Sequence, residues 1–313
     1  MSKNVLVVGS INVDYVIQTE RLPKLGETLS GSGFSVNCGG KAANQAVAIA
    51  KAGCTVKMLG AVGADNAADM AVENLRASGV DVSEILRVPG PTGAAVITVC
   101  GGDNHIILDE GANRSMTPDV IAAREHLFAW ADIVVMQFEI PIETVVAAAR
   151  LAKQYGKQVI LNPAPVKAVD PALYTDVDLV VPNEFEAGLI TGIEQNTDAD
   201  ARAAIKALKE MGCKNAIITL GGSGSAYGVG DDVHFAGIYK VKRVDTTAAG
   251  DSFIGGICAK LCEGADLDSA VAYASAVSAI AVSRAGASVS IPLASEVQDF
   301  LKDHTIEAYI ERK

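Results

Sequence analysis

The sequence predicts an α/β protein with a mainly parallel central sheet between two layers of helices, together with a small second β-sheet. From about residue 110, short apolar runs alternate with segments of helical periodicity, a pattern typical of parallel sheets covered on both faces. Residues 11–38 and 85–109 instead carry glycine and proline and alternate like exposed antiparallel strands. With 313 residues, 50% of them hydrophobic, the chain can bury a large core without disulfides or metals.

The strands of the central sheet are expected at short apolar runs, and a hairpin is expected over roughly 225–244. The runs are Asn4 to Val8, Thr55 to Val62, Ile133 to Gln137, Gln158 to Asn162, Leu179 to Val181 and Ala216 to Leu220. Helices are expected where apolar residues recur every three or four positions. These segments are Gly39 to Gly53, Asn66 to Ala77, Asp119 to Trp130, Ile142 to Tyr155, Ala199 to Met211, Gly250 to Glu263, Leu267 to Arg284 and Ala294 to His304.

The two segments that do not fit the parallel sheet are alike in character, so we expect them to pair as one small sheet. This sheet would be a lid, inserted after the first strand and again near residue 90. The chain then divides into a main α/β domain of residues 1–12, 39–92 and 110–313 and a β-lid of residues 13–38 and 93–109.

Charge and composition exclude several classes of partner. There are 26 basic and 37 acidic residues, a net charge of −11 with no basic block, so nucleic acids and anionic membranes are not expected to bind. The longest uncharged run without glycine or proline, 269–283, has 15 residues and is too short to span a membrane. Six cysteines without a CxxC pair, and no signal-peptide pattern, indicate a cytoplasmic protein.

The sharpest motif runs from Val244 to Phe253, where a strand ends, small residues follow and a helix begins near Gly250. Small residues let backbone N–H groups approach a ligand, and a helix N-terminus favours an anion. Asp251 could accept a proton there. The alternative is a tight turn in which Asp251 caps the helix.

Polar residues also follow the ends of other predicted strands, at the edge where open α/β sheets bind ligands. Asn12 and Asp14 follow the first strand, Glu139 follows Ile133 to Gln137, and the segment 38–45 opens a helix with two glycines and carries Asn44. These side chains could hydrogen-bond to a sugar. They could equally form plain polar turns, with Asn44 facing solvent.

Two further strand ends suggest a nucleotide. Asn183 and Glu186 have i, i+3 spacing, which fits a carboxylate that holds Mg²⁺ through water and fits a helix capping box equally well. The glycine-rich segment 219–224 precedes a strand rather than a helix, so it is neither a Walker A loop nor a dinucleotide fingerprint. It could still pack on a base or a phosphate.

Taken together, these motifs resemble the PfkB family of carbohydrate kinases over residues 3–303. Residues 39–44 (GGKAAN) are similar to the N-terminal signature of the family, and residues 245–251 (DTTAAGD) to its C-terminal signature. The resemblance implies the ribokinase-like three-layer α/β/α fold, with a nine-stranded central sheet and a lid that often pairs across a homodimer. It also implies ATP-dependent phosphorylation of D-ribose at O5, which gives D-ribose 5-phosphate and ADP.

The resemblance also implies roles for individual residues. Asp251 is the expected general base, and an anion hole is formed by the N–H groups of Ala248, Ala249 and Gly250. The sugar is expected to be held by Asn12, Asp14, Gly40, Lys41, Asn44 and Glu139, and the co-substrate ATP by Asn183, Thr219, Gly221, Gly224 and Ser275. Glu186 is expected to position Mg²⁺ indirectly. The expected K⁺ ligands are Asp245, Thr247, Ala281, Arg284, Gly286 and Ser290.

Two other functions compete with ribose phosphorylation. A sister kinase could act on deoxyribose, fructose or a nucleoside, although the polar Asn12 favours ribose over a deoxysugar. A sugar-sensing protein could have kept the fold and lost catalysis, but Asp251 and the small residues around it are intact.

Overall fold

The computed structural model describes residues 3–101 and 103–313; residues 1, 2 and 102, which fall in the predicted main domain and lid, lie outside the described residues. An eight-stranded sheet in the order β14-β13-β12-β11-β10-β9-β1-β4 forms the centre of the molecule. All pairs from β12 to β4 are parallel, and β12–β13 and β13–β14 are antiparallel. The strands are β1 (Asn4–Val8), β4 (Thr55–Leu59), β9 (Ile133–Gln137), β10 (Gln158–Asn162), β11 (Leu179–Val180), β12 (Asn215–Thr219), β13 (Ser225–Val229) and β14 (Asp232–Ala236).

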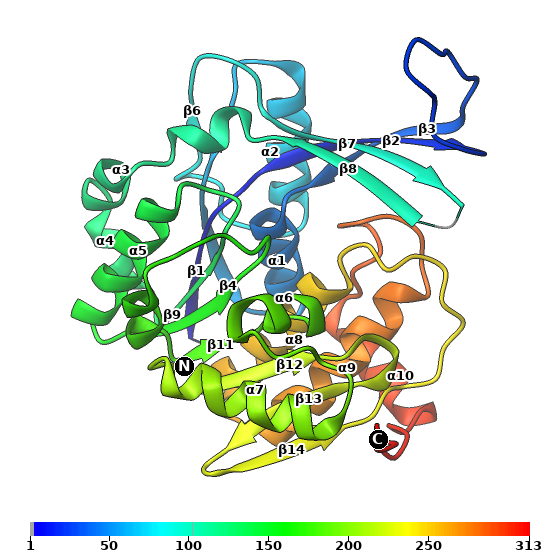
Figure 1. The fold of residues 1–313 in the computed structure, drawn as a ribbon. Coiled ribbons are helices and arrows are strands. Elements are labelled where there is room, and N and C mark those ends of the chain that lie inside the picture. Colours follow the sequence, from blue (N-terminus) through cyan, green and yellow to red (C-terminus); the bar gives the residue numbers. More distant parts are fainter. Residues whose placement is uncertain (1–2, 102) are drawn as a thin grey trace.

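Helices cover both faces of this sheet, which gives the predicted three layers (Figure 1). They are α1 (Lys41–Lys51), α2 (Asn66–Ala77), α3 (Pro118–Ala122), α4 (Glu125–Trp130), α5 (Ile142–Gln154), α6 (Glu184–Thr191), α7 (Asp198–Glu210), α8 (Ala249–Glu263), α9 (Leu267–Val282) and α10 (Ala294–Asp303). Short 3₁₀ turns occur at Gly111–Ser115, Pro171–Asp176 and Gly221–Ser223. Within the described residues, no helix has the length and apolar character needed to cross a bilayer.

The buried side chains divide into two large cores because successive residues of a strand point to opposite faces of the sheet. On β1, Val5 and Val7 pack into the core that includes residues of α1, α2 and α8. Leu6 and Val8 pack into the core that includes residues of α5 and α7. The central strands are therefore apolar on both faces, which explains why they appear in the sequence as unbroken apolar runs.

The second sheet has four strands in the order β3-β2-β7-β8 and projects from the main body (Figure 1). The strands are β2 (Asn12–Thr19), β3 (Ser32–Gly39), β7 (Gly93–Cys100) and β8 (Asp103–Asp109). The expectation of purely antiparallel pairing is wrong, since β2 and β7 are parallel from Asn12↔Gly93 outward. Both strands leave the edge of the main body in the same direction, so they can only pair in parallel.

Three predicted segments differ from the structure by more than a shift of a few residues at their ends. The strand expected over 55–62 is divided at Gly60, and β5 (Ala61–Val62) pairs with β6 (Leu86–Arg87) in a separate two-stranded sheet. The central sheet therefore has eight strands rather than nine, with a single parallel bridge, Lys57–Asp81, at its edge. The helix expected over 119–130 is broken into α3 and α4, and the expected hairpin ends at Ala236.

Close contact between α1 and α8 brings two distant parts of the sequence together. A Cβ on Gly255 of α8 would lie 2.3 Å from the Cβ of Ala48 on α1, so only glycine allows this approach. Ala48 lies one turn after Asn44, and Gly255 lies one turn after Asp251. The contact therefore sets the first turns of the two helices, which carry Asn44 and Asp251, against each other.

Candidate active site

Asp251 lies in the first turn of α8 and is 8% exposed. Its Oδ2 accepts a hydrogen bond from Nδ2 of Asn44 at 3.2 Å, and its Oδ1 accepts one from Nε2 of Gln45 at 2.9 Å. Burial raises the pKa of Asp251, while Lys41 and the two amides oppose this change and Glu139 adds to it. The structure therefore surrounds one buried carboxyl with donors that favour its ionised form.

Lys41 supplies positive charge to this cluster of acidic groups. Burial alone lowers the pKa of its ammonium, but the carboxylates of Asp251, Glu139 and Glu186 outweigh burial and raise it. Glu139 is itself held in place, because its Oε2 accepts from the backbone N–H of Lys41 at 3.0 Å and from Oγ of Ser10 at 2.6 Å. An uncharged, hydroxyl-rich ligand would find both donors and acceptors here.

Asn12 and Asp14 lie beside this cluster at the start of β2 and are both buried. Oδ1 of Asn12 accepts from Nδ2 of Asn113 at 2.7 Å, so the NH₂ group of Asn12 points the other way and forms no hydrogen bond within the described residues. Sequence reasoning missed the contact of Asn113 with Asn12, which lies 101 positions away in the chain. Burial, then Glu139 and Asp251, raise the pKa of Asp14 to about 7.

Glycine lets α1 begin close to the first strand. Gly40 caps α1 with φ of 91°, and a Cβ there would lie 2.8 Å from the backbone nitrogen of Asn12. Ala42 fits close to the first strand because Gly9 faces it: a Cβ on Gly9 would lie 2.6 Å from that of Ala42. The polar residues of α1 and β2 therefore reach the same small volume.

The N-terminus of α8 has an unusual backbone. Ala248 is the one non-glycine residue with positive φ in the described part of the chain, at 60°, a left-handed conformation that costs about 1 kcal/mol or more for alanine. Of the three N–H groups predicted to form an anion hole, that of Ala249 donates to the carbonyl of Thr246 at 3.1 Å. Those of Ala248 and Gly250 form no such bond within the described residues.

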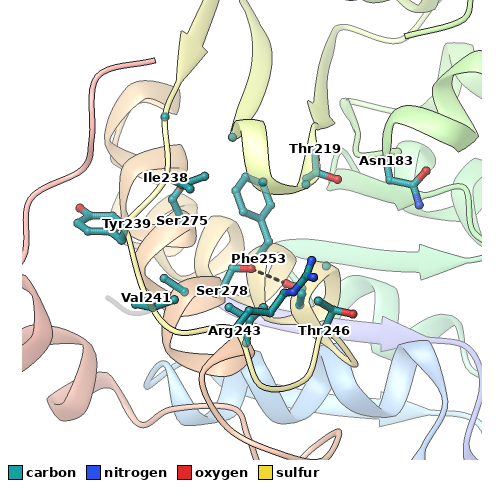
Figure 2. A pocket seen from close by; sticks show the side chains of 18 of the residues that line it. Asn183, Thr219, Ile238, Tyr239, Val241, Arg243, Thr246, Phe253, Ser275 and Ser278 are labelled. Atoms are coloured by element: carbon teal, nitrogen blue, oxygen red, sulfur yellow. Dashed lines mark hydrogen bonds between the residues drawn. The ribbon is translucent and has the colours of Figure 1, made fainter. Parts of the chain in front are cut away.

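All five residues predicted to bind ATP line one cavity of about 540 Å³ (Figure 2). Ala249 and Gly250 also line it, so the cavity reaches the first turn of α8. Sequence reasoning missed its apolar wall, which includes Ile238, Tyr239, Val241, Phe253, Ala279 and Val282, and the exposed Arg243 at its edge. Half of the named wall residues come from 237–243, where the sequence suggested a strand.

Asn183 and Glu186 form the capping box at the start of α6. The side chain of Asn183 accepts from the N–H of Glu186 at 2.8 Å, and Oε2 of Glu186 accepts from the N–H of Asn183 at 2.8 Å. Burial raises the pKa of Glu186. The cap uses only one carboxylate oxygen, so the other is free to meet a hydrated cation.

The residues predicted to bind K⁺ lie on the loop before α8, at the end of α9 and on the loop after α9, and Asp245 joins the two loops. Its Oδ1 accepts from N and Oγ1 of Thr247 at 2.9 and 2.7 Å, and its Oδ2 accepts from the N–H of Gly286 at 3.0 Å. Burial raises the pKa of Asp245, but these hydrogen bonds outweigh burial and lower it. The guanidinium of Arg284 pairs with Glu296 at 2.7 Å and, as a cation with no acceptor, cannot ligate K⁺, so only the carbonyl of Arg284 could do so.

The remaining two K⁺ candidates are Ala281, whose carbonyl accepts from the N–H of Arg284 at 3.1 Å, and the buried Ser290. In residues 3–101 and 103–313, no three His, Cys, Asp or Glu side chains come together as a metal site. A cation at the predicted Mg²⁺ site or at the predicted K⁺ site would therefore rely on one carboxylate, that of Glu186 or Asp245, together with carbonyl, water or phosphate oxygens. That donor set fits K⁺ and Mg²⁺, which prefer oxygen.

The chain matches the family model for pfkB family carbohydrate kinases over residues 2–294. It is 36% identical to the ribokinase of Haemophilus influenzae, covering 96% of this chain and 99% of that protein. It is 35% identical to the deoxyribokinase of Salmonella typhi, covering 95% and 98%. It is also 38% identical to a bifunctional ribokinase/ribose-5-phosphate isomerase A of Fructilactobacillus sanfranciscensis, and here 99% of this chain spans only 58% of the relative.

The chain is also similar to solved structures of ribokinases. The structure of Arabidopsis thaliana ribokinase complexed with ribose and ATP has a TM-score of 0.90 and 32% sequence identity, covering 96% of this chain and 99% of that one. The ribokinase of Thermotoga maritima has a TM-score of 0.88 and 35% identity, covering 96% and 100%. The predicted ribokinase-like fold is confirmed.

The raised pKa of Asp14 predicts a pH-dependent effect of Asp14→Asn on stability. Between the unfolded value of 3.8 and the folded value of about 7, the folded protein retains a proton that the unfolded chain releases, so wild-type stability falls as pH rises through this window. The full difference corresponds to roughly 4 kcal/mol. Asp14→Asn removes this titrating group and with it the loss of stability at high pH. The variant should therefore gain more stability relative to the wild type at pH 8 than at pH 5.

Urea unfolding of both proteins at the two pH values measures this difference. Glu311→Gln, which neutralises an exposed carboxyl far from Asp14 in the sequence, serves as the control. An equal gain for Asp14→Asn at pH 5 and pH 8 would show that the Asp14 carboxyl is not the group that titrates.

Proposed function

The chain belongs to the pfkB family of carbohydrate kinases, and we propose that it transfers the γ-phosphoryl group of ATP to O5 of D-ribose. A sugar kinase must bring a hydroxyl group and a nucleotide to the two sides of one catalytic group. The first turn of α8 has this position: Ala249 and Gly250 line the nucleotide-sized cavity, and Asp251 contacts Asn44 and Gln45 on the other side. This observation carries the proposal.

Binding of the sugar is assigned to the polar residues around Asp251. The NH₂ group of Asn12 is free to donate to a hydroxyl, while the carboxyls of Asp14 and Glu139 accept from hydroxyls. Asn44 and Lys41 on α1 and the backbone of Gly40 complete the set. A sugar with many hydroxyls satisfies more of these buried groups than a deoxysugar does, which is why ribose is preferred in this proposal.

Asp251 acts as the general base. As the sugar oxygen attacks the γ-phosphorus, its proton moves to the Asp251 carboxylate, the bond from the γ-phosphorus to the β,γ-bridging oxygen breaks, and ADP leaves. The N–H groups of Ala248 and Gly250, at the positive end of α8, stabilise the charge on the transferring group, and Ala249 joins them if its turn bond to Thr246 opens.

ATP occupies the cavity bordered by Asn183, Thr219, Gly221, Gly224 and Ser275, with its base against the apolar wall. Mg²⁺, when bound, neutralises phosphate charge, and K⁺ adds positive charge near the loop before α8. Glu186 is assigned to Mg²⁺ through water. Asp245, as the charged group, is assigned to K⁺ together with Thr247, Ala281, Arg284, Gly286 and Ser290.

The competing substrate is deoxyribose, because the deoxyribokinase of Salmonella typhi is about as similar to this chain as the ribokinases are. We further propose that the enzyme works in the cytoplasm on small molecules and not on nucleic acid or membranes. Its net charge of −11 would repel both polyanions.

We also propose that the four-stranded sheet acts as a lid and that two copies of it form a homodimer. The strand register sets Val36, Val96 and Ile107 in one row on one face, with 39%, 49% and 74% of their surfaces exposed. Apolar residues in such a row favour burial against another surface. A second lid presents a matching surface because dimer interfaces with two-fold symmetry are self-complementary.

A coupled assay of ADP release tests the substrate. With ATP and Mg²⁺, we expect kcat/KM for D-ribose to exceed that for 2-deoxyribose, fructose and adenosine by at least about tenfold, since a missing hydroxyl leaves buried polar groups unpaired. Replacing Na⁺ by K⁺ should raise the rate. A preference for another acceptor would overturn the assignment of ribose but leave the kinase intact, and no turnover with any sugar would overturn both.

The role of Asp251 is tested by Asp251→Asn, which keeps the size of the side chain and removes the base. Turnover should fall at least about 100-fold, the size of general-base assistance. Ribose binding, measured by calorimetry, should change little. Wild-type turnover in this variant would contradict the assigned role.

Sedimentation velocity tests the dimer. The wild type should sediment with twice the chain mass of 32.3 kDa, and Ile107→Glu, which places a charge in the apolar row, should sediment as a monomer. Ile310→Glu is the matched control because Ile310 is also exposed, at 81%, but lies near the C-terminus. A monomeric wild type, or an Ile107→Glu variant that stays dimeric, would exclude this interface.

A further inference from the structure

We propose that Gln45 is a positioning residue for Asp251 and that Asn162 and Gln137 fix the orientation of its amide so that it always donates to the Asp251 carboxylate. The proposal rests on the assigned role of Asp251 as the base, and it gives roles to three residues for which the sequence motifs predicted none. All three side chains are buried: Gln45 and Gln137 are 0% exposed, and Asn162 is 8% exposed.

Gln45 lies at the centre of a network of buried amides. Its Nε2 donates to Oδ1 of Asp251 at 2.9 Å and to Oδ1 of Asn162 at 3.2 Å. Its Oε1 accepts a hydrogen bond from Nε2 of Gln137. Both hydrogens and the oxygen of the Gln45 amide are therefore used, and no water is needed to complete the set.

The direction of every bond in this network follows from one backbone group. Nδ2 of Asn162 donates to the carbonyl of Val181 at 2.9 Å, and a carbonyl can only accept. The Oδ1 of Asn162 must therefore face Gln45, which requires Gln45 to present its NH₂ group on that side. The same NH₂ group reaches Asp251. Turning the Gln45 amide over would set its oxygen against two acceptors, which is strongly unfavourable in a buried site.

Gln137 donates to the oxygen of the Gln45 amide, but among the residues that the structure describes its own amide oxygen has no hydrogen bond. Its Oε1 is buried without a hydrogen-bond partner within the described residues, and a Cβ on Gly9 would lie only 2.3 Å from it. An unpartnered buried oxygen is unfavourable, so this side chain is held by tight packing and by its bond to Gln45. A glutamine in such a position makes sense if the orientation of Gln45 matters.

A fixed donor matters because burial favours the protonated form of Asp251 and raises its pKa, and the carboxylate of Glu139 adds to this effect. Lys41 on α1 and the amides of Gln45 and Asn44 act in the opposite direction, while Asp14 on β2 and Glu186 on α6 are further acidic groups whose own pKa values are raised in part by Asp251. Gln45 binds Oδ1 at 2.9 Å, whereas Asn44 binds Oδ2 at 3.2 Å. Gln45 thus keeps the carboxylate ionised and its Oδ1 fixed, and Oδ2 is the oxygen that receives the proton.

Gln45→Met tests the proposal, because methionine has a similar length and cannot donate. A lost hydrogen bond to a charged group is worth about tenfold or more. On the acid limb of the pH profile we expect kcat/KM for ribose to fall at least about tenfold, because the limb itself should move up by about one pH unit. On the alkaline plateau, where Asp251 is ionised in both enzymes, the difference from the wild type should become several-fold smaller. Gln137→Met, which does not touch Asp251, should shift the limb in the same direction by less.

The control is Thr144→Val, which removes a different fully buried hydrogen bond, the one from Oγ1 of Thr144 to the carbonyl of Met116 at 2.6 Å. It should lower thermal stability without moving the pH profile. A folded Gln45→Met enzyme with a wild-type pH profile overturns the proposal. If Gln45→Met does not fold, an unshifted acid limb in Gln137→Met overturns it. Wild-type turnover in Asp251→Asn would instead remove the base role itself, so the two failures are distinguishable.

Discussion

A single buried carboxyl group, Asp251, is the constraint on which the rest of the site depends. Burial opposes its ionised form, so the fold must bring hydrogen-bond donors and a cation to it. The donors are Asn44 and Gln45 on α1. They reach Asp251 because α1 and α8 pack closely at Ala48 and Gly255, one turn further along each helix. Small residues in this helix contact are thus as much a part of the site as its polar groups.

The N-terminus of α8, which carries Asp251, also explains how a chain with net charge −11 can bind phosphates. The cavity that borders Ala249 and Gly250 presents backbone N–H groups at the positive end of α8. Lys41 adds a charged group from α1, and its carboxylate neighbours keep it protonated. These are local contributions, which a whole-chain charge does not reveal. The acidic composition therefore argues against long polyanions and is compatible with ATP.

Sequence patterns predicted the elements that are surrounded by apolar residues on both faces. Strands buried on both faces, such as Asn4–Val8 and Gln158–Asn162, appear as apolar runs and were found with their correct ends. Breaks such as Gly60, and the parallel pairing of β2 with β7, depend on the path of the chain in space and were missed. The five residues proposed for the nucleotide line one cavity; four of them lie at motifs or strand ends, whereas Ser275 on α9 was assigned from the family resemblance alone. No role was predicted for Gln45, although it lies in the segment 38–45, or for Gln137, because their roles follow from a buried hydrogen-bond network that only the fold assembles.

The central claim is that Asp251 takes a proton from the sugar hydroxyl that receives the phosphoryl group. The most direct measurement is a crystal structure of this protein with D-ribose and a non-hydrolysable ATP analogue. The claim predicts O5 of ribose within about 2.6–3.2 Å of Oδ2 of Asp251, in line with the γ-phosphorus, with Gln45 still bound to Oδ1. A ribose whose O5 lies beyond hydrogen-bond reach of Asp251, with another side chain next to that hydroxyl, would contradict it.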